Sequence, residues 1–185
     1  MSTRPRRRTM GILGWSLTTA GLLAGLVSVA TIVGCFMPRR HVAARTLTLR
    51  QPPPAVWAVI RDGQTYPEWW GLIKSVTRLP DRDGKEVWQL DYKDGNRFEL
   101  RVDEADEPRR LVLRIDDAKK LFEGTWDYAL EPAGDGGSRL TLTEHGEINV
   151  PFVRLMARLL MSPHMYIDMH LKALAAKFGE TPVLQ

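Results

Sequence analysis

The feature that most constrains this chain is an uncharged apolar run near its N-terminus, at residues 10–37. The run consists mostly of Leu, Val, Ile, Ala and Gly, and a helix needs roughly 20 such residues to cross the hydrocarbon core of a bilayer. A helix over residues 10–37 is therefore long enough to span a membrane with some tilt. We predict a single-pass transmembrane helix there, preceded by a basic tail at residues 1–9.

Two other interpretations of this run stay open. The arginines within residues 4–8 precede the apolar stretch as they do in a secretory signal peptide, although the stretch is longer than a usual cleaved segment. The tetrapeptide Ile32-Val33-Gly34-Cys35 also resembles the bacterial lipobox, which makes Cys35 a candidate lipidation site. All three interpretations put the protein in an exported or membrane setting.

The net charge of +4 is unevenly distributed along the chain. Residues 1–50 hold eight of the 26 basic residues and no acid, which leaves 18 basic against 22 acidic residues in the remainder. The basic sequence pI of about 9.4 therefore arises from residues 1–50, where we expect the arginines beside the apolar run to pair with lipid phosphates. No basic stripe is interleaved with aromatic residues, so a nucleic-acid partner is not expected.

The arginines beside the apolar run also bear on orientation. Four lie before the run within residues 4–8, and four lie after it, at positions 39, 40, 45 and 50. The first group is more tightly clustered and adjoins the free amino group, which favours an N-terminus inside and a domain on the non-cytoplasmic side of the membrane. The oligomeric state is left open by the sequence.

Metal and redox chemistry find little support in the sequence. Cys35 is the only cysteine, so an intramolecular disulfide and a cysteine-rich zinc site are both excluded. His164 and His170 are six residues apart and fall on different helix faces, while His41 and His145 have no ligand-spaced neighbour. No Gly-rich phosphate loop or Gly-x-Ser-x-Gly elbow occurs. We expect neither a metal nor a cofactor.

Beyond a linker at residues 38–41, apolar and polar residues alternate in short runs, which is typical of an antiparallel sheet. We predict a domain at residues 42–179 and a C-terminal tail at 180–185. A first strand is expected at 45–50, a short helix at 53–61 and a helical turn near 65–70. Six further strands are expected near 72–79, 85–92, 97–105, 110–116, 121–132 and 139–148, with turns at Asp83-Gly84, Asp94-Gly95 and Asp135-Gly136-Gly137.

The pattern becomes helical after Gly146. Apolar residues recur at helical spacing, which predicts the longest helix of the domain with one broad apolar stripe. Ser162-Pro163 interrupts the pattern and predicts a kink or a restart there. The stripe consists of Phe152, Met156, Leu159, Leu160, Ile167, Leu171, Leu174 and Phe178.

Several of these stretches resemble a known family. The run RQPPPAVWAVIRD at residues 50–62, followed by YPEWW at 66–70, resembles the opening of the polyketide cyclase/dehydrase and lipid-transport group of the START/birch-allergen-like (SRPBCC) superfamily. The run LTLTEHGEI at 140–148, with Leu171 and Leu174, is similar too. The resemblance covers about residues 42–179. It implies an α+β helix-grip fold: a seven-stranded curved antiparallel sheet around a long C-terminal helix, with a mostly apolar cavity between them. The superfamily includes lipid-binding proteins, cyclases and other enzymes.

The strand at 121–132 supplies the best candidates for a ligand-binding cavity. Phe122, Gly124, Trp126, Tyr128 and Leu130 share one face, and Gly124 leaves space on it; ordinary core packing is the alternative for each of them. The full set predicted to line the cavity is Trp70, Trp88, Phe98, Leu100, Leu113, Phe122, Trp126, Tyr128, Glu144, Met156 and Leu160.

Glu144 is the only candidate for catalysis. It shares its phase with Leu140 and Leu142, so strict alternation points a carboxylate inward, where it could act as an acid or base, with Tyr128 as a partner, or bind a ligand hydroxyl. A bulge at Gly146 would instead leave it as a solvated strand-end residue. The leading interpretation is a membrane-anchored binding protein for a lipid or other hydrophobic small molecule. A cyclase or dehydratase and a ligand-free partner-binding domain are the alternatives.

Overall fold

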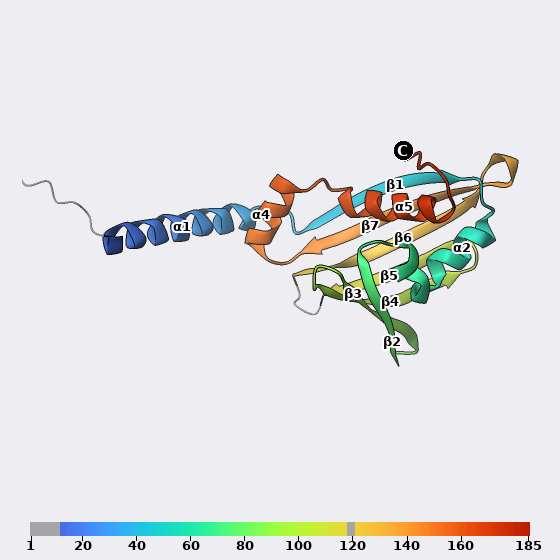
Figure 1. Ribbon diagram of the computed structural model, residues 1–185, viewed down its shortest axis with the longest axis horizontal. Helices are drawn as coiled ribbons and strands as arrows, with labels where there is room; N and C mark the ends of the chain where they lie inside the picture. Colours follow the sequence, from blue (N-terminus) through green and yellow to red (C-terminus); the bar gives the residue numbers. More distant parts are fainter. Residues whose placement is uncertain (1–11, 118–120) are drawn as a thin grey trace, which may run out of the picture.

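A long N-terminal helix projects from a sheet-and-helix domain (Figure 1). The structure is a computed structural model and describes residues 12–117 and 121–185. Helix α1, Ile12–Cys35, contains a stretch of 21 residues, Trp15–Cys35, with a mean hydropathy of 1.9 and almost no buried surface. This helix is long and apolar enough to cross a membrane, and a signal sequence would satisfy the same criterion. The predicted basic tail at 1–9 and the first residues of the predicted span lie outside the described residues.

Seven antiparallel strands form one sheet in the order β1-β7-β6-β5-β4-β3-β2, so the predicted strand number is confirmed. Strand β1 begins five residues earlier than predicted, inside the expected linker, because Arg40 to Ala44 pair with Thr143 to Glu147 of β7. The strands are β1 (Arg40–Leu49), β2 (Ile73–Arg82), β3 (Lys85–Tyr92), β4 (Arg97–Asp106), β5 (Arg110–Asp117), β6 (Phe122–Pro132) and β7 (Ser138–Ile148).

Three short helical elements follow β1. Helix α2, Pro53–Arg61, has prolines in its first turn and buries Val56, Trp57 and Ile60, as the helical spacing predicts. A single 3-10 turn, Gly63–Thr65, leads into α3, Tyr66–Trp69. The Tyr66 hydroxyl donates a 2.6 Å hydrogen bond to the Ile60 carbonyl. This bond ties α3 back onto α2.

Two helices complete the domain, and the predicted restart at Ser162-Pro163 is confirmed. Helix α4 is Pro151–Leu160 and helix α5 is Met165–Lys177. The single apolar stripe that was expected across both helices is wrong. Helix α5 buries Ile167, Leu171 and Leu174 in the domain core, whereas α4 packs on α1. The break allows α4 to turn toward α1 while α5 lies along the sheet (Figure 1).

The C-terminal residues pair with the exposed edge of the sheet. Gln185 and Thr46 exchange two backbone hydrogen bonds of 3.0 Å, and Leu184 bridges to Leu47. Strand β1 is an edge strand, and a free edge is prone to pair with other chains. The segment predicted as a tail thus covers part of that edge.

Candidate functional site

The face of the sheet that α5 covers, called the inner face here, contains an unbroken row of side chains from strands β5, β6, β7 and β1. Leu113 pairs with Trp126, Trp126 with Glu144 and Glu144 with Ala43. No register shift interrupts β7 in its pairing with β6 or β1. Glu144 therefore points inward and is 4% exposed, so Gly146 does not turn it outward.

Deep in the domain, a ring of aromatic side chains surrounds His170 of α5. The ring centroids of Trp70 and Trp126 lie 4.6 Å and 4.9 Å from that of His170, and the Tyr128 hydroxyl lies 3.1 Å from His170 Nε2. Burial lowers the pKa of His170 to about 3 and raises the pKa of Tyr128 well above its ordinary value. Both side chains are therefore neutral near pH 7.

Four polar atoms of this region have no hydrogen-bond partner among the described residues. They are Nδ1 of His170 and the indole Nε1 atoms of Trp69, Trp70 and Trp126. Buried polar atoms are nearly always paired with protein or ordered water, so each such exception needs an explanation. These atoms could bind a polar group or water that enters this region.

The inner face becomes accessible at the end nearest α1, called the open end here. Half-buried Tyr92 of β3 and Phe98 of β4 meet there edge to face, with ring centroids 5.1 Å apart. Phe122, at the start of β6, is also half-buried, and Tyr166, in the first turn of α5, is 46% exposed. Burial raises the pKa of Tyr92, and the nearby Tyr166, Asp94 and Glu144 raise it further.

Glu144 and His41 form an ionisable pair at the open end. His41 Nε2 lies 3.8 Å from Glu144 Oε1, and the His41 side chain is 27% exposed. No hydrogen bond to the Glu144 carboxylate is found within residues 12–117 and 121–185, although a buried carboxylate is costly unless it is paired or solvated. The two oxygens are therefore available to a hydrogen-bond donor at the open end.

Two glycines lie beside this pair. Gly124 of β6 pairs with Gly146 of β7, and Gly146 pairs with His41 of β1. A Cβ atom on Gly124 would lie 2.4 Å from the His145 carbonyl oxygen, and one on Gly146 would lie 2.2 Å from the His41 ring. The close approach of the two strands thus requires Gly124, which is a reason for this glycine other than ligand space.

The structure separates the predicted cavity residues into four groups. Five are buried in the core, three lie at or beside the open end, one lies under α2, and two lie on α4. Met156 and Leu160 do not join the others, because α4 turns toward α1, and Leu160 is 77% exposed. In the same order, the groups are Trp70, Leu100, Leu113, Trp126 and Tyr128; Phe98, Phe122 and Glu144; Trp88; and Met156 and Leu160.

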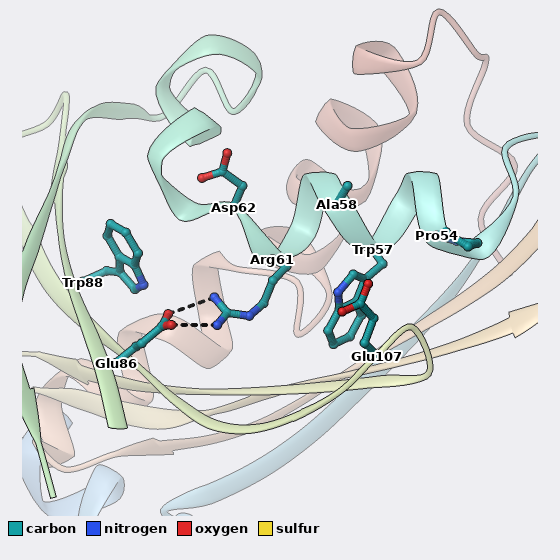
Figure 2. Close-up of a pocket in the computed structure, with 8 residues that line it drawn as sticks. All are labelled: Pro54, Trp57, Ala58, Arg61, Asp62, Glu86, Trp88 and Glu107. Carbon is teal, nitrogen blue, oxygen red and sulfur yellow. Dashed lines mark hydrogen bonds and ion pairs between the residues drawn. The ribbon is translucent and has the colours of Figure 1, made fainter. Parts of the chain in front are cut away.

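Trp88 lines a hollow of about 430 Å³ between α2 and the sheet (Figure 2). The Arg61 guanidinium donates two 2.9 Å hydrogen bonds to the Glu86 carboxylate across this hollow. These bonds hold the pKa of Glu86 below its ordinary value. Arg61 and Glu86 neutralise each other at the centre of this hollow. Neither charge is therefore free to bind a charged ligand.

A second hollow, of about 470 Å³, lies near the ends of β1, β6 and β7. Its lining includes Arg114, Thr125 and His145, which alternate with inward-facing residues and so belong to the outer face of the sheet. Neither hollow is the space between sheet and α5, which buried side chains fill along most of its length.

Sequence reasoning missed four residues of this region: His41, Tyr92, Tyr166 and His170. Tyr92 shares a phase with Trp88 and Leu90, and His170 belongs to the helical stripe of Ile167, Leu171 and Leu174, so periodicity could have found both. His41 and Tyr166 carry no such signal, because each lies at the first turn or first residues of its element. Within residues 12–117 and 121–185, no group of three or more His, Cys, Asp or Glu side chains could hold a metal ion.

Comparison with known proteins agrees with this architecture. The family model described as polyketide cyclase / dehydrase and lipid transport matches residues 40–179. No protein with a curated description matches the sequence.

Solved structures with the same fold include the Zhui aromatase/cyclase from Streptomyces sp. R1128, with a TM-score of 0.63 and 15% identity over 75% of this chain and 93% of that one. A START superfamily protein from Mycobacterium smegmatis has a TM-score of 0.59 and 18% identity over 74% and 96%. Norcoclaurine synthase from Thalictrum flavum has a TM-score of 0.60 and 11% identity over 75% and 93%. At these identities the likeness is one of fold.

Proposed function

The chain belongs to the polyketide cyclase/dehydrase and lipid transport family, and on that premise we propose that it is a membrane-anchored binding protein for a lipid or other hydrophobic small molecule. The observation that carries the proposal is the make-up of the open end. Phe98, Phe122 and Tyr92 are half-buried at the same end of the sheet as the buried Glu144 carboxylate, which accepts no hydrogen bond from the described residues. Ligand sites for small molecules combine apolar walls with a few convergent polar groups in this way.

The expected ligand follows from this lining. An apolar body would contact Phe98 and Phe122, and a hydroxyl or similar donor would bind Glu144, whose side-chain oxygens can accept hydrogen bonds. The unpaired nitrogens around His170 lie further inside and could bind a second polar group or a water. An anionic headgroup is disfavoured beside Glu144.

The anchor is α1. Its 24 residues span about 36 Å at the rise of an α-helix, which exceeds the roughly 30 Å of a bilayer core. We propose that α1 crosses the membrane with the N-terminus inside and residues 38–185 on the non-cytoplasmic side. A cleaved signal peptide and lipidation at Cys35 are the alternatives.

Bound molecules can be sought directly in the domain without its anchor. The solved structures of like fold correspond to the domain alone, so removal of residues 1–33, which keeps all of β1 and the residues just before it, should leave a folded protein. Solvent extraction and mass spectrometry of the purified domain should then find a co-purified apolar molecule. Phe98→Lys, which places a charge at the open end, should abolish this, whereas Glu99→Lys, on the opposite face of β4, should not. A wild-type domain that neither carries nor takes up any apolar molecule would refute the proposal.

Catalysis at Glu144 is the second candidate, favoured by the burial of its carboxylate beside His41. A carboxylate in a mostly apolar site is suited to removing a proton next to a carbonyl group. Tyr128 is a poor partner for this chemistry, because its hydroxyl bonds to His170. Once a ligand is identified, Glu144→Gln should retain binding and lose turnover. If the wild-type protein releases its ligand unchanged, binding alone is the function.

A further inference from the structure

Helix α4 carries an apolar face that the described part of the protein leaves largely uncovered. Leu159 and Leu160 are 66% and 77% exposed, while Phe152 and Met156, on the same face, are only partly buried. The helix is strongly amphipathic, because its apolar side chains lie on one face and its arginines on another. One of these arginines, Arg154, is 4% exposed. Such an amphipathic helix with exposed leucines has the form of a helix that lies in a membrane interface.

The position of α4 is fixed by the end of α1. The Arg154 guanidinium donates hydrogen bonds to the carbonyls of Gly34 at 2.8 Å and Met37 at 3.0 Å. Gly34 is buried against Pro151, so closely that a Cβ atom on it would lie 2.0 Å from the Pro151 carbonyl oxygen. Helix α4 is therefore bound to the last turn of α1 and the residues just after it.

The last turn of α1 and the residues just after it are also where the apolar run ends and charged residues begin. The uncharged stretch ends at Met37, and the first charged residues beyond it are Arg39 and Arg40. Both are more than half exposed, although each also pairs with Glu147. Exposed Arg158 of α4 adds a third arginine, and arginines at this level suit lipid phosphates.

From these contacts we infer that α4 lies in the interface of the membrane that α1 spans, with Leu159 and Leu160 among the lipid chains and the arginines among the phosphates. This inference rests on the proposed anchoring by α1. Its consequence is that the open end faces the lipid: α5 begins five residues after α4 ends, and its first turn carries half-exposed Tyr166. The ligand would then be a membrane-resident apolar molecule that enters from the bilayer.

Site-specific quenching in vesicles tests this inference. The full chain with Cys35→Ala carries a single introduced cysteine, labelled with an environment-sensitive fluorophore, in vesicles of phosphatidylcholine and phosphatidylglycerol. Leu160→Cys should be quenched about twofold or more by a spin label carried just below the headgroup, as expected for an interfacial helix. Lys172→Cys, exposed on α5, is the matched control and should not be quenched.

A third site separates the two possible failures. Leu22→Cys, in the middle of α1, should be quenched by a spin label at the end of the acyl chain. If it is quenched and Leu160→Cys is not, the anchor stands and the interfacial position of α4 is refuted. If neither is quenched, the anchoring itself fails. Efficient crosslinking of Leu160→Cys to its own copy, without lipid quenching, would show that a second copy covers α4 and would also overturn the inference.

Discussion

At the scale of single residues, His170 shows how the burial of one titratable side chain makes the stability of the fold depend on pH. It is fully buried, and its pKa falls to about 3 from an ordinary value near 6.5 in the unfolded chain. Between these two values the unfolded chain binds a proton that the folded chain does not. The contribution of neutral His170 to stability is therefore fully present above about pH 6.5 and is lost as the pH falls toward 3.

Replacing His170 should remove this dependence. Urea unfolding of the full chain in detergent should give a free energy that falls by up to about 1.4 kcal/mol per pH unit below pH 6.5 in the wild type. His170→Gln, which can still pair with the Tyr128 hydroxyl, should show a clearly smaller slope. His145→Gln, on the exposed face of β7, is the control and should keep the wild-type slope. Equal slopes in all three proteins would contradict the assignment.

Gly124 gives a second prediction at this scale. Because its Cβ would lie 2.4 Å from a backbone oxygen, Gly124→Ala must push β6 and β7 apart. We expect a loss of about 1–3 kcal/mol of unfolding free energy, as for other overpacked positions. Gly134→Ala, with nothing within 4 Å, should change it by less than about 0.5 kcal/mol. Thermal and urea unfolding measure both, and an unchanged Gly124→Ala would mean that the strands separate freely.

The sequence predicted which strand residues lie on the inner face, but not which helical residues pack against that face. Alternation correctly placed Trp126 and Tyr128 on one face, because a strand's period of two leaves only two choices. It left Glu144 open between the inner face and a solvated position after a bulge, and the unbroken pairing of β7 excludes the bulge. Helical periodicity failed for Met156 and Leu160. An apolar stripe shows that a helix has an apolar partner, but it does not say whether this partner is the sheet, another helix or a membrane.

At the scale of elements, Arg154 joins three segments through backbone carbonyls alone. Besides those of Gly34 and Met37, it bonds to the carbonyls of Ile148 and Asn149 at 3.1 Å and 3.3 Å. The Gly34 and Met37 carbonyls lie at the C-terminal end of α1, where a positive charge is favourable. No periodicity marks such a residue, which is why sequence reasoning could not find it.

Loss of this arginine should loosen the end of α1. Arg154→Met removes donors from buried carbonyls, and each buried acceptor left unpaired costs about 1–3 kcal/mol. Hydrogen–deuterium exchange of the amides in residues 34–40 should therefore accelerate by roughly 10- to 100-fold. Arg158→Met, exposed on the same helix, should leave exchange unchanged. Equal protection in both variants would show that α1 and α4 are held by apolar contacts instead.

At the scale of the whole molecule, the seven strands and their turns followed from sequence, because alternation and turn residues are local signals. Asp83 and Gly84, for example, adopt positive φ at the predicted β2–β3 turn. The packing of α4 on α1 was not predictable in this way, since it joins segments more than 100 residues apart. It bears directly on whether α1 is retained, because cleavage before Cys35 would remove Gly34 from its contact with Pro151.

Retention of α1 has a simple measurement. If α1 is a permanent span, the intact mass of the purified membrane protein should include residues 2–34, with or without the initiator methionine. A signal peptide or a lipoprotein would instead yield a shorter chain, in the second case beginning at a diacylated Cys35. Cys35→Ala should change neither the mass of the rest of the chain nor its membrane fraction. A wild-type chain that begins at residue 35, together with a Cys35→Ala chain that keeps residues 2–34, would favour lipidation over a span.

Orientation is the remaining property of the whole molecule, and it depends on a near balance of charge. Arginines flank the apolar run equally in number, and the proposed orientation rests on the tighter N-terminal cluster, which favours an N-terminus inside. In intact cells, a membrane-impermeant maleimide should label Lys172→Cys in the Cys35→Ala background, whereas Ser2→Cys should react only after permeabilisation. The reverse pattern would place the domain in the cytoplasm. The open end would still face the bilayer in that case, since α4 is bound to the end of α1, but it would draw its ligand from the inner leaflet instead of the outer one.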